Sequence, residues 1–316
     1  MPALPLLIIM KSVIAFLVKW LLIFAVASVM IFGVVRLMPS TPVEQWLTSF
    51  NLPHTEENVA KVTALMGLDR PLPVQYFAWL RNFFKGDWGL SLISHVSIRE
   101  TFMQKLPYSV SIGLSGILIS AVLAFFLGYR AALHIGGVCD RLSAALAVFS
   151  QSIPSFITSV FIIYFLGVKL RAVKFFTGSV RNAMISAIMI TAVYQLGGLS
   201  RVVRNAFREE MGKSYVRFAI SRGFSRDYVL FRHASRPVLC TLIGAVIANF
   251  AWVFGGSTVL EFAFTIPGVS YFLVDSMQSS DYTVLQTYLL VVVIWMFCVH
   301  AVLNLVLYAL DVRRRA

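Results

Sequence analysis

Cysteine is scarce in this sequence, and so are acidic residues. The 316 residues include three cysteines, Cys139, Cys240 and Cys298, which lie far apart and match no metal-binding or redox spacing. We therefore expect no disulfide framework. Charged residues make up 13% of the chain, and 27 Lys and Arg outnumber 14 acids, giving a net charge of +13. In so apolar a chain this excess indicates positively charged cytoplasmic loops, and we expect no nucleic-acid partner.

The motifs of several enzyme classes are also missing. The sequence contains no G-x-x-x-x-G-K-[ST] phosphate loop, so this chain is predicted neither to bind nor to hydrolyse ATP. It has no H-E-x-x-H pattern, its five histidines are scattered, and Cys298 and His300 fall on different faces of a helix. These absences predict that the chain is not an enzyme, has no catalytic or metal-binding residues, and holds no cofactor itself.

Long hydrophobic runs dominate the rest of the sequence. Hydrophobic residues make up 59% of the chain and the mean hydropathy is +0.81, above the ~45–50% typical of soluble domains. Several windows exceed the ~18 uncharged apolar residues that a membrane span needs. The sequence therefore predicts an all-α polytopic membrane protein, with its first segment retained as an anchor. The six transmembrane helices are expected at residues 20–37, 109–128, 142–166, 182–199, 238–260 and 283–307. Residues 1–19 could form an interfacial helix or a lead-in.

A basic loop at residues 201–237 separates the fourth and fifth spans. It holds nine Lys and Arg against three acids, which predicts a cytoplasmic location. Residues 213–222 contain no Gly or Pro and are expected to form a short helix that ends at Gly223. Ser225 is a suitable N-cap for a second short helix at 226–235, and Pro237 suits the start of the next span. The prediction is two short helices that lie along the membrane.

This loop resembles the coupling loop of ABC-importer permeases, most closely those of the peptide/nickel group. The similarity runs over Tyr215-Val216-Arg217-x-Ala219-x-x-x-Gly223-Phe224-Ser225 and Leu230-x-Arg232-His233-Ala234-x-Arg236. In that family the loop is a cytoplasmic knob that seats in a groove of the ATPase subunit. The resemblance implies that eight residues couple this chain to an ATPase: Tyr215, Arg217, Ala219, Gly223, Ser225, Arg232, His233 and Arg236.

A long polar loop at residues 38–108 is expected on the outer face. Thr55 suits the N-cap of a helix, and Gly67 and Gly86 suit turns. Tyr76, Trp79 and Phe83 recur at helical spacing and are expected at the membrane interface. The segments Met66-Gly67-Leu68-Asp69-Arg70-Pro71-Leu72 and Gly86-Asp87-Trp88-Gly89-Leu90-Ser91 resemble the outer loop of the same permease group. This loop could be a scaffold or part of the docking surface for an external solute receptor.

Polar residues and helix breakers inside the spans suggest a translocation path. Gln151, Ser152 and Pro154 interrupt the third span, and Gln151 is expected to point inward because facing lipid would be costly. Similar Ser-Ile-Pro-Ser segments lie beside the path in the family, although a purely structural kink is an equal alternative. Gly255, Gly256 and Glu261 follow in the fifth span, where Glu261 could be a gate or a helix-end acid tied into the next loop. The sequence 194–198 is small and polar enough for close helix contact.

The resemblance covers nearly the whole chain and implies one half of an importer channel. It divides the chain into residues 1–37, the extracytoplasmic loop 38–108 and a permease core 109–316. The location would be a bacterial inner membrane, with both termini cytoplasmic. The expected partners are the lipid bilayer, a second homologous permease, two ATPase subunits that bind ATP and Mg, and an extracytoplasmic solute-binding protein.

The substrate is predicted as nickel or a metallophore complex, with a dipeptide or oligopeptide as the alternative. Asn304 stands where the family usually has an acid in the last helix, which puts an ion pair there in doubt. Two other classes of protein remain open. A membrane scaffold or sensor would not need the Gly-centred loop, and an ion-driven transporter would need paired charges at mid-membrane.

Overall fold

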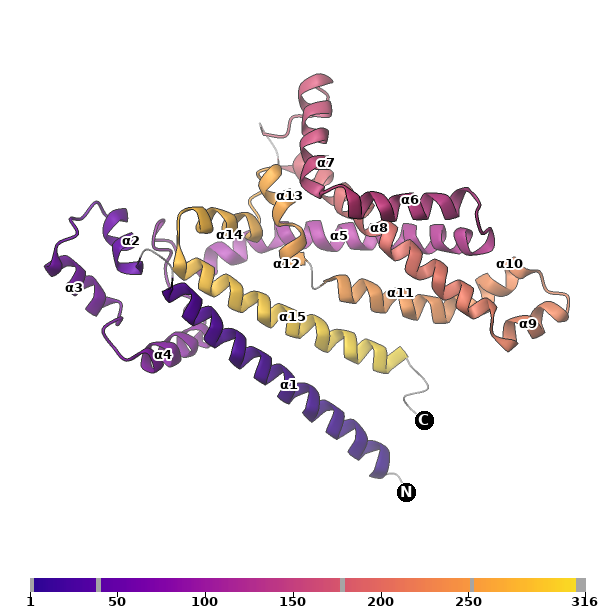
Figure 1. The fold of residues 1–316 in the computed structure, drawn as a ribbon, viewed down its shortest axis with the longest axis horizontal. Coiled ribbons are helices and arrows are strands. Elements are labelled where there is room, and N and C mark those ends of the chain that lie inside the picture. The colour runs from indigo at the N-terminus through magenta and orange to yellow at the C-terminus, as the bar shows by residue number, and fades with distance from the viewer. Residues whose placement is uncertain (1–2, 38–40, 177–179, 251–252, 311–316) are drawn as a thin grey trace. The chain divides into compact units, whose positions relative to one another are not determined.

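A computed structural model describes residues 3–37, 41–176, 180–250 and 253–310, and it is helical throughout (Figure 1). In these residues the only strand-like pairing is an isolated bridge between Leu90 and Ser97. Five helices are long and apolar enough to cross a membrane, and a bent pair, Val138–Ser152 with Ser155–Lys169, would make a sixth span. The predicted all-α polytopic membrane fold is therefore confirmed. The basic C-terminal residues Arg313, Arg314 and Arg315 lie outside the described residues.

The helices fall into two compact units. The first consists of Met1–Gln104 with Phe272–Cys298, and the second of Lys105–Tyr271 with Val299–Ala316. Three helices, α5, α14 and α15, are each divided between the two units. The helices run as follows: α1 Ala3–Arg36, α2 Pro42–Ser49, α3 Glu56–Leu65, α4 Leu72–Lys85, α5 Ile98–Leu133, α6 Val138–Ser152, α7 Ser155–Ile162, α8 Arg181–Met211, α9 Ser214–Ser221, α10 Arg226–Val229, α11 Ser235–Phe250, α12 Val253–Gly256, α13 Thr258–Ala263, α14 Val269–Gln278 and α15 Tyr282–Leu310.

In the first unit, α1 packs against the N-terminal part of α15. Val35 of α1 clusters with Tyr282 and Leu285, and the rings of Phe16 and Phe297 stack with centroids 5.9 Å apart, so the two helices are antiparallel. Because α1 is one helix from Ala3 to Arg36, residues 3–19 are a lead-in continuous with the span rather than a separate helix.

The outer loop of the first unit contains α2, α3 and α4. As predicted, Thr55 caps α3 by accepting a hydrogen bond from the Asn58 N–H, and Gly67 and Gly86 take φ values of +65° and +86°. The aromatic stripe of α4 packs on protein: Tyr76 and Trp79 both contact the Phe32 ring of α1. The stripe that was expected at the membrane interface therefore helps to fasten the loop to α1.

In the second unit, α8 is the central helix, and α6 and α11 pack along it. The predicted third span is broken at Ile153 and Pro154, where α7 turns from the α6 direction by 96° (Figure 1). A π-helical segment, Ile163–Lys169, continues α7. A buried cluster that includes Leu199, Val203 and Phe207 joins α8 to its neighbours.

Several expected boundaries were wrong. The second span begins at Ile98 rather than at residue 109, so Pro107 lies inside α5. The fourth span, expected to end at residue 199, runs to Met211, and this places Arg201, Arg204 and Arg208 on α8 instead of in the loop. Charge alone could not show this, because a helix can leave the membrane without ending.

The second short helix of the loop is not separate either. The segment α10 passes through one π-helical turn, Leu230–Ala234, directly into α11. Pro237 therefore lies within a continuous helix, where its ring lacks an N–H and crowds the carbonyl of the preceding turn. The wider π turn just before Pro237 accommodates this, so the helix does not need to end.

Candidate coupling segment and translocation groove

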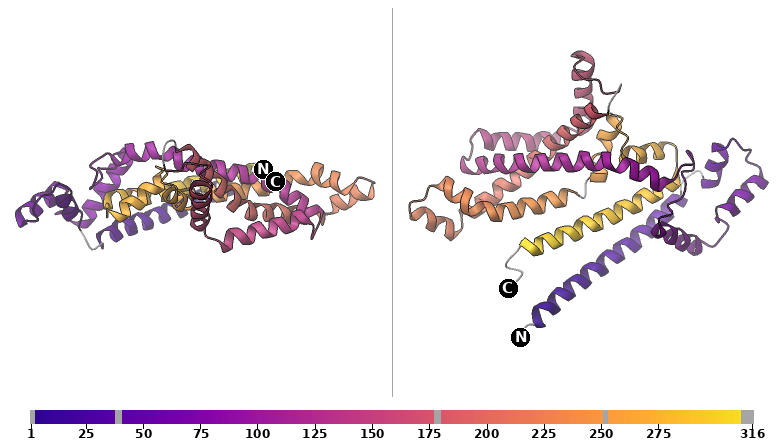
Figure 2. Two further views of the ribbon diagram at one scale, coloured as in Figure 1. Left: turned by 90° about the horizontal axis from the view of Figure 1, so that it is seen from above. Right: turned by 180° about the vertical axis from the view of Figure 1, so that it is seen from behind.

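The residues predicted to contact an ATPase lie on one segment, residues 212–236, which we call the coupling segment. Its first helix, α9, ends at Ser221, and Gly223 follows with φ +90°. The Ser225 hydroxyl then caps α10 by accepting a hydrogen bond from the Tyr228 N–H at 3.3 Å. The local prediction of helix, Gly turn and Ser cap is confirmed, and Figure 2 shows the turn between α9 and α10 at one end of the second unit.

Apolar residues anchor the coupling segment to the long helices. Val216 of α9 and Val229 of α10 are fully buried. Leu230 and Ala234 are also fully buried, in a cluster with Phe207 of α8 and Tyr129 of α5. The inner face of the segment is therefore part of the core, and it cannot shift freely relative to α8.

Polar contacts add to this anchoring. The buried Glu210 carboxylate, at the end of α8, pairs with Lys213 and accepts a hydrogen bond of 2.5 Å from the Tyr215 hydroxyl. Burial, and then the nearby Glu210 carboxylate, raise the pKa of Tyr215 above its ordinary value. The Tyr129 hydroxyl donates to Asp227 Oδ1 at 2.7 Å. Sequence reasoning did not identify Glu210, Tyr129 or Asp227, although Glu210 and Lys213 have helical i, i+3 spacing.

The outer face of the coupling segment is aromatic and basic. Phe218 is 63% exposed, and the exposed rings of Phe224 and Tyr228 stack with centroids 5.6 Å apart. Of the eight predicted coupling residues, Ala219 is half-buried. The other seven are exposed: Tyr215, Arg217, Gly223, Ser225, Arg232, His233 and Arg236. The segment thus has a fixed inner face and an outer face that is open on this chain.

A groove of about 190 Å³ lies in the second unit, where α5, α7, α8 and the α11–α13 region meet. Its polar lining side chains are hydroxyls and amides. The lining residues are Gly113, Ile117, Ser155, Ile190, Thr191, Tyr194, Gln195, Asn249, Val253, Gly256, Ser257 and Leu260. None of these lining residues carries a charge, so the groove can offer neutral hydrogen bonds and apolar contact.

The structure brings only part of the predicted path together. Gly256 lines the groove, whereas Gly255 is exposed and lies outside the lining. Ser152 and Pro154 are exposed at the helix break beside Ser155, which does line the groove. Gln151 is exposed on this chain, so it does not point into the chain's own interior as expected.

Glu261 lies behind the groove wall and is completely buried. Its carboxylate accepts hydrogen bonds from the Ser257 hydroxyl at 2.8 Å and the Tyr271 N–H at 2.9 Å. The Ser109 hydroxyl accepts from the Val269 N–H, and a Cβ atom added at Gly268 would collide with the Glu261 carboxylate. Of the two roles considered for Glu261, the helix-end acid tied into the following loop fits these contacts, and the gate stays a prediction.

The chain is similar to transport permeases of several bacteria. It is 26% identical over 284 residues to a probable peptide ABC transporter permease of Sinorhizobium fredii, covering 87% of this chain and 90% of the relative. It is 27% identical to a dipeptide transport permease of Lactococcus lactis (81% and 82% covered). It is 26% identical to a glutathione transport permease of Shigella flexneri (90% and 92% covered). These relatives agree with a chain that is not an enzyme.

Two family models also match, and they leave only a short stretch between them. The model for the N-terminal part of binding-protein-dependent transport system membrane components matches residues 6–113. The model for the inner membrane component itself matches residues 124–316, more than half of the chain. With its apolar helices and its coupling segment, this chain therefore belongs to the binding-protein-dependent transport system inner membrane components, as a multi-pass ABC-importer permease of the peptide/nickel group.

Proposed function

We propose that this permease forms half of the path through which an ABC importer moves short peptides, including glutathione-like ones. The main support is the neutral groove between α5, α7, α8 and α12, because its hydroxyl and amide side chains can form hydrogen bonds with the amide groups of a peptide. The relatives point the same way, because their names specify peptide, dipeptide and glutathione transport. The nickel or metallophore substrate that the sequence first suggested has no such support from them.

The substrate proposal is tested by uptake in cells that carry the complete importer. Cells with the intact chain and cells lacking it are given a radiolabelled dipeptide, glutathione, or nickel-63 as its histidine chelate. Uptake of the dipeptide or glutathione that requires this chain supports the proposal. Chain-dependent uptake of the nickel chelate alone would overturn it in favour of the metal substrate. The ligand retained by the purified solute-binding protein gives an independent measurement.

The coupling segment is proposed to dock on one of two ATPase subunits, which hold ATP and Mg, while a second permease completes the channel. An external solute-binding protein delivers the peptide. Support comes from the exposed rings of Phe218, Phe224 and Tyr228 on a segment whose inner face is buried. Aromatic side chains of this kind are common anchors in protein interfaces. Both chain termini are proposed to lie in the cytoplasm, on the same side as this segment.

Docking is tested by co-purification of the ATPase with matched variants. Phe218→Ser removes an exposed ring from α9, and its control Phe77→Ser removes a ring of similar exposure, 66%, from α4. Phe218→Ser is expected to lower ATPase recovery about tenfold, and Phe77→Ser to leave it unchanged. Equal recovery from both variants would favour the membrane-scaffold alternative.

Gly223 gives a second variant of the same kind. An added Cβ there meets no atom within 4 Å, so Gly223→Ala strains the backbone at φ +90° without a steric clash. The control Gly67→Ala also adds a Cβ atom at a residue with positive φ, +65°, in the outer loop. Only the Gly223 change should weaken ATPase recovery, because only it alters the turn of the coupling segment. A loss of recovery in both variants would mean general misfolding instead.

A further inference from the structure

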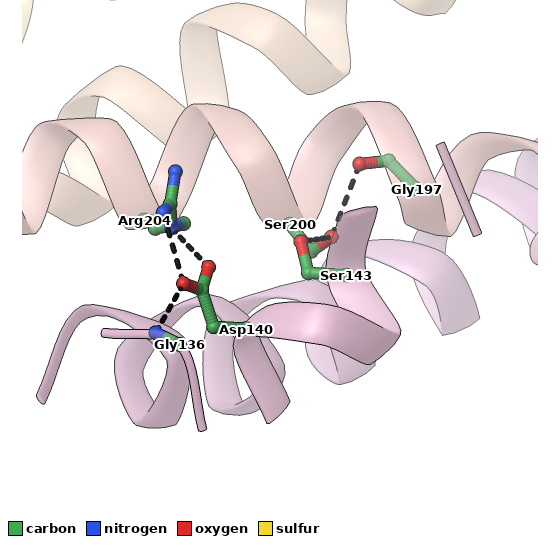
Figure 3. Close-up of polar contacts among 6 residues, drawn as sticks. All are labelled: Gly136, Asp140, Ser143, Gly197, Ser200 and Arg204. Carbon is green, nitrogen blue, oxygen red and sulfur yellow. Dashed lines mark hydrogen bonds and ion pairs between the residues drawn. The ribbon is translucent and has the colours of Figure 1, made fainter. Parts of the chain in front are cut away.

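Helices α6 and α8 are joined by a regular series of contacts along their shared face (Figure 3). At one end, Arg204 Nε lies 2.5 Å from Asp140 Oδ1, and Arg204 Nη2 donates to Asp140 Oδ2 at 3.1 Å. The hydroxyls of Ser143 and Ser200 follow, 2.8 Å apart and both buried. The contacts step forward along α6 while they step back along α8, so they recur about once per helical turn of two antiparallel helices.

The next contact in this series is steric. A Cβ atom added at Gly197 would lie 2.5 Å from the backbone nitrogen of Ala147, so the two helix backbones touch there. Sliding α6 along α8 would drive a larger side chain into this contact. It would also separate the Asp140 carboxylate, 9% exposed, from its guanidinium. Three successive contacts therefore fix the register of α6 against α8. They are the Asp140–Arg204 ion pair, the Ser143–Ser200 hydrogen bond and the close approach of Gly197 to Ala147.

One turn further, the series reaches the break before α7. The Tyr194 hydroxyl of α8 donates to the Ile153 carbonyl at 2.8 Å and also bonds the Thr158 hydroxyl at 2.7 Å. In a straight helix the Ile157 N–H would occupy the Ile153 carbonyl, but here it bonds Pro154 instead. Tyr194 therefore bonds the last turn of α6 and the first turn of α7 through one oxygen, and it also lines the groove.

We propose that α6 and α8 move as one rigid lever during transport, and that the Tyr194 hydroxyl is the positioning group that sets the angle of α7 at the groove. The opposite end of α8 is fixed to the coupling segment through Glu210 and Phe207. A displacement of the coupling segment would then move α6 and α8 together, without sliding at their interface. The movement would in this way reach the α6–α7 break. This inference rests on the proposed coupling to an ATPase.

The lever is tested by cross-linking in the assembled importer. Cys139, Cys240 and Cys298 are first replaced by alanine, and Ser143→Cys with Ser200→Cys is then joined by oxidation or by a short methanethiosulfonate reagent. If α6 and α8 move together, the cross-linked importer transports peptide at the rate of the reduced one. Loss of transport that reduction restores would overturn the lever.

The role of Tyr194 is tested by removing its hydroxyl alone. Tyr194→Phe keeps the ring contact with Phe149 but leaves the Ile153 carbonyl and the Thr158 hydroxyl without this partner. The number of peptides imported per ATP hydrolysed is expected to fall about tenfold. Tyr164→Phe, at an exposed tyrosine in the π-helical segment after α7, is the control and should change nothing.

The outcome separates this inference from the proposed function. If the importer assembles and hydrolyses ATP with Tyr194→Phe but keeps its normal import per ATP, the positioning role is wrong and the coupling proposal stands. If the ATPase does not co-purify even with the unaltered chain, the coupling proposal is wrong. The lever depends on that proposal and would then be wrong as well.

Discussion

Two buried carboxylates in the second unit, Asp140 and Glu261, are held in opposite ways. Asp140 has a cationic partner, Arg204, together with the Gly136 N–H at 2.8 Å. Glu261 is completely buried, and its carboxylate is held by neutral donors that include the Ser257 hydroxyl and the Tyr271 N–H. The Asp140 pair connects two long helices, whereas Glu261 fastens a short loop onto its own helix end.

The difference shows what each contact can tolerate. A carboxylate–guanidinium pair is a strong and directional contact, which suits two helices that move as one. A carboxylate held by several neutral donors depends on the position of every donor, so it suits a part of the fold that stays fixed. We therefore expect substitutions around Glu261 to act through tight packing, and substitutions at Asp140 and Arg204 to act through charge.

The largest effect is expected at Gly268. In Gly268→Val the added Cβ atom would collide with the Glu261 carboxylate and lie 2.7 Å from the Ser109 hydroxyl oxygen. Overpacking together with lost hydrogen bonds should lower the free energy of unfolding by about 3 kcal/mol. Thermal unfolding of the detergent-solubilised protein, followed by size-exclusion fluorescence, measures this. Gly255→Val is the control, because no atom lies within 4 Å of an added Cβ there.

Removing the cation should have the next largest effect. Arg204→Leu leaves the Asp140 carboxylate with its Gly136 N–H alone, and we expect a loss of about 2 kcal/mol, reduced from the fully buried case because both side chains keep some solvent. Arg201→Leu removes an exposed arginine from the same helix and serves as the control. Adding Asp140→Ala to Arg204→Leu should restore part of the stability, and an additive loss would contradict the pairing.

A smaller effect is expected when Glu261 loses its charge but keeps its shape. Glu261→Gln retains an acceptor for Ser257, but its amide group would face the Tyr271 N–H, a second donor. The expected loss is about 1 kcal/mol, less than for Arg204→Leu, because no ion pair is broken. The same melting measurement compares the two variants directly. A greater loss from Glu261→Gln would show that the negative charge itself stabilises the loop.

The smallest effect concerns the third buried carboxylate, Glu210, and depends on pH. Tyr215→Phe removes the hydrogen bond to Glu210 and should cost about 0.5–1 kcal/mol near neutral pH. Because the pKa of Tyr215 is raised in the folded state, this contribution is complete below the ordinary pKa of 10.0 and is lost as the pH rises above it. Melting curves at pH 8 and pH 10.5 should therefore show the wild type and the variant converging. A constant gap would contradict the assignment.

Much of the candidate site could be predicted because its signals are local. Gly223 and Ser225 mark a turn and a cap from the chemistry of single residues, and both lie where the pattern placed them. Hydropathy located the apolar helices in the same way. The end of α8 was predicted too early because its basic residues were taken as the start of a loop, whereas packing lets the helix continue. The end of α10 was wrong because Pro237 was taken as the start of a new helix, whereas a π-helical turn joins α10 to α11.

The sequence by itself determined that this chain is a bundle of apolar helices with a basic, glycine-centred coupling segment. Hydropathy, capping and turn preferences depend on neighbouring residues, and they need no knowledge of the fold. Only the tertiary structure decided that Asp140 meets Arg204, 64 residues away, that Tyr194 closes the Ile153–Pro154 break, and that Glu261 is enclosed by Ser257 and Tyr271. These partners follow no sequence period, because they are set by which helix faces pack together and by how closely Gly197 and Gly268 let them approach.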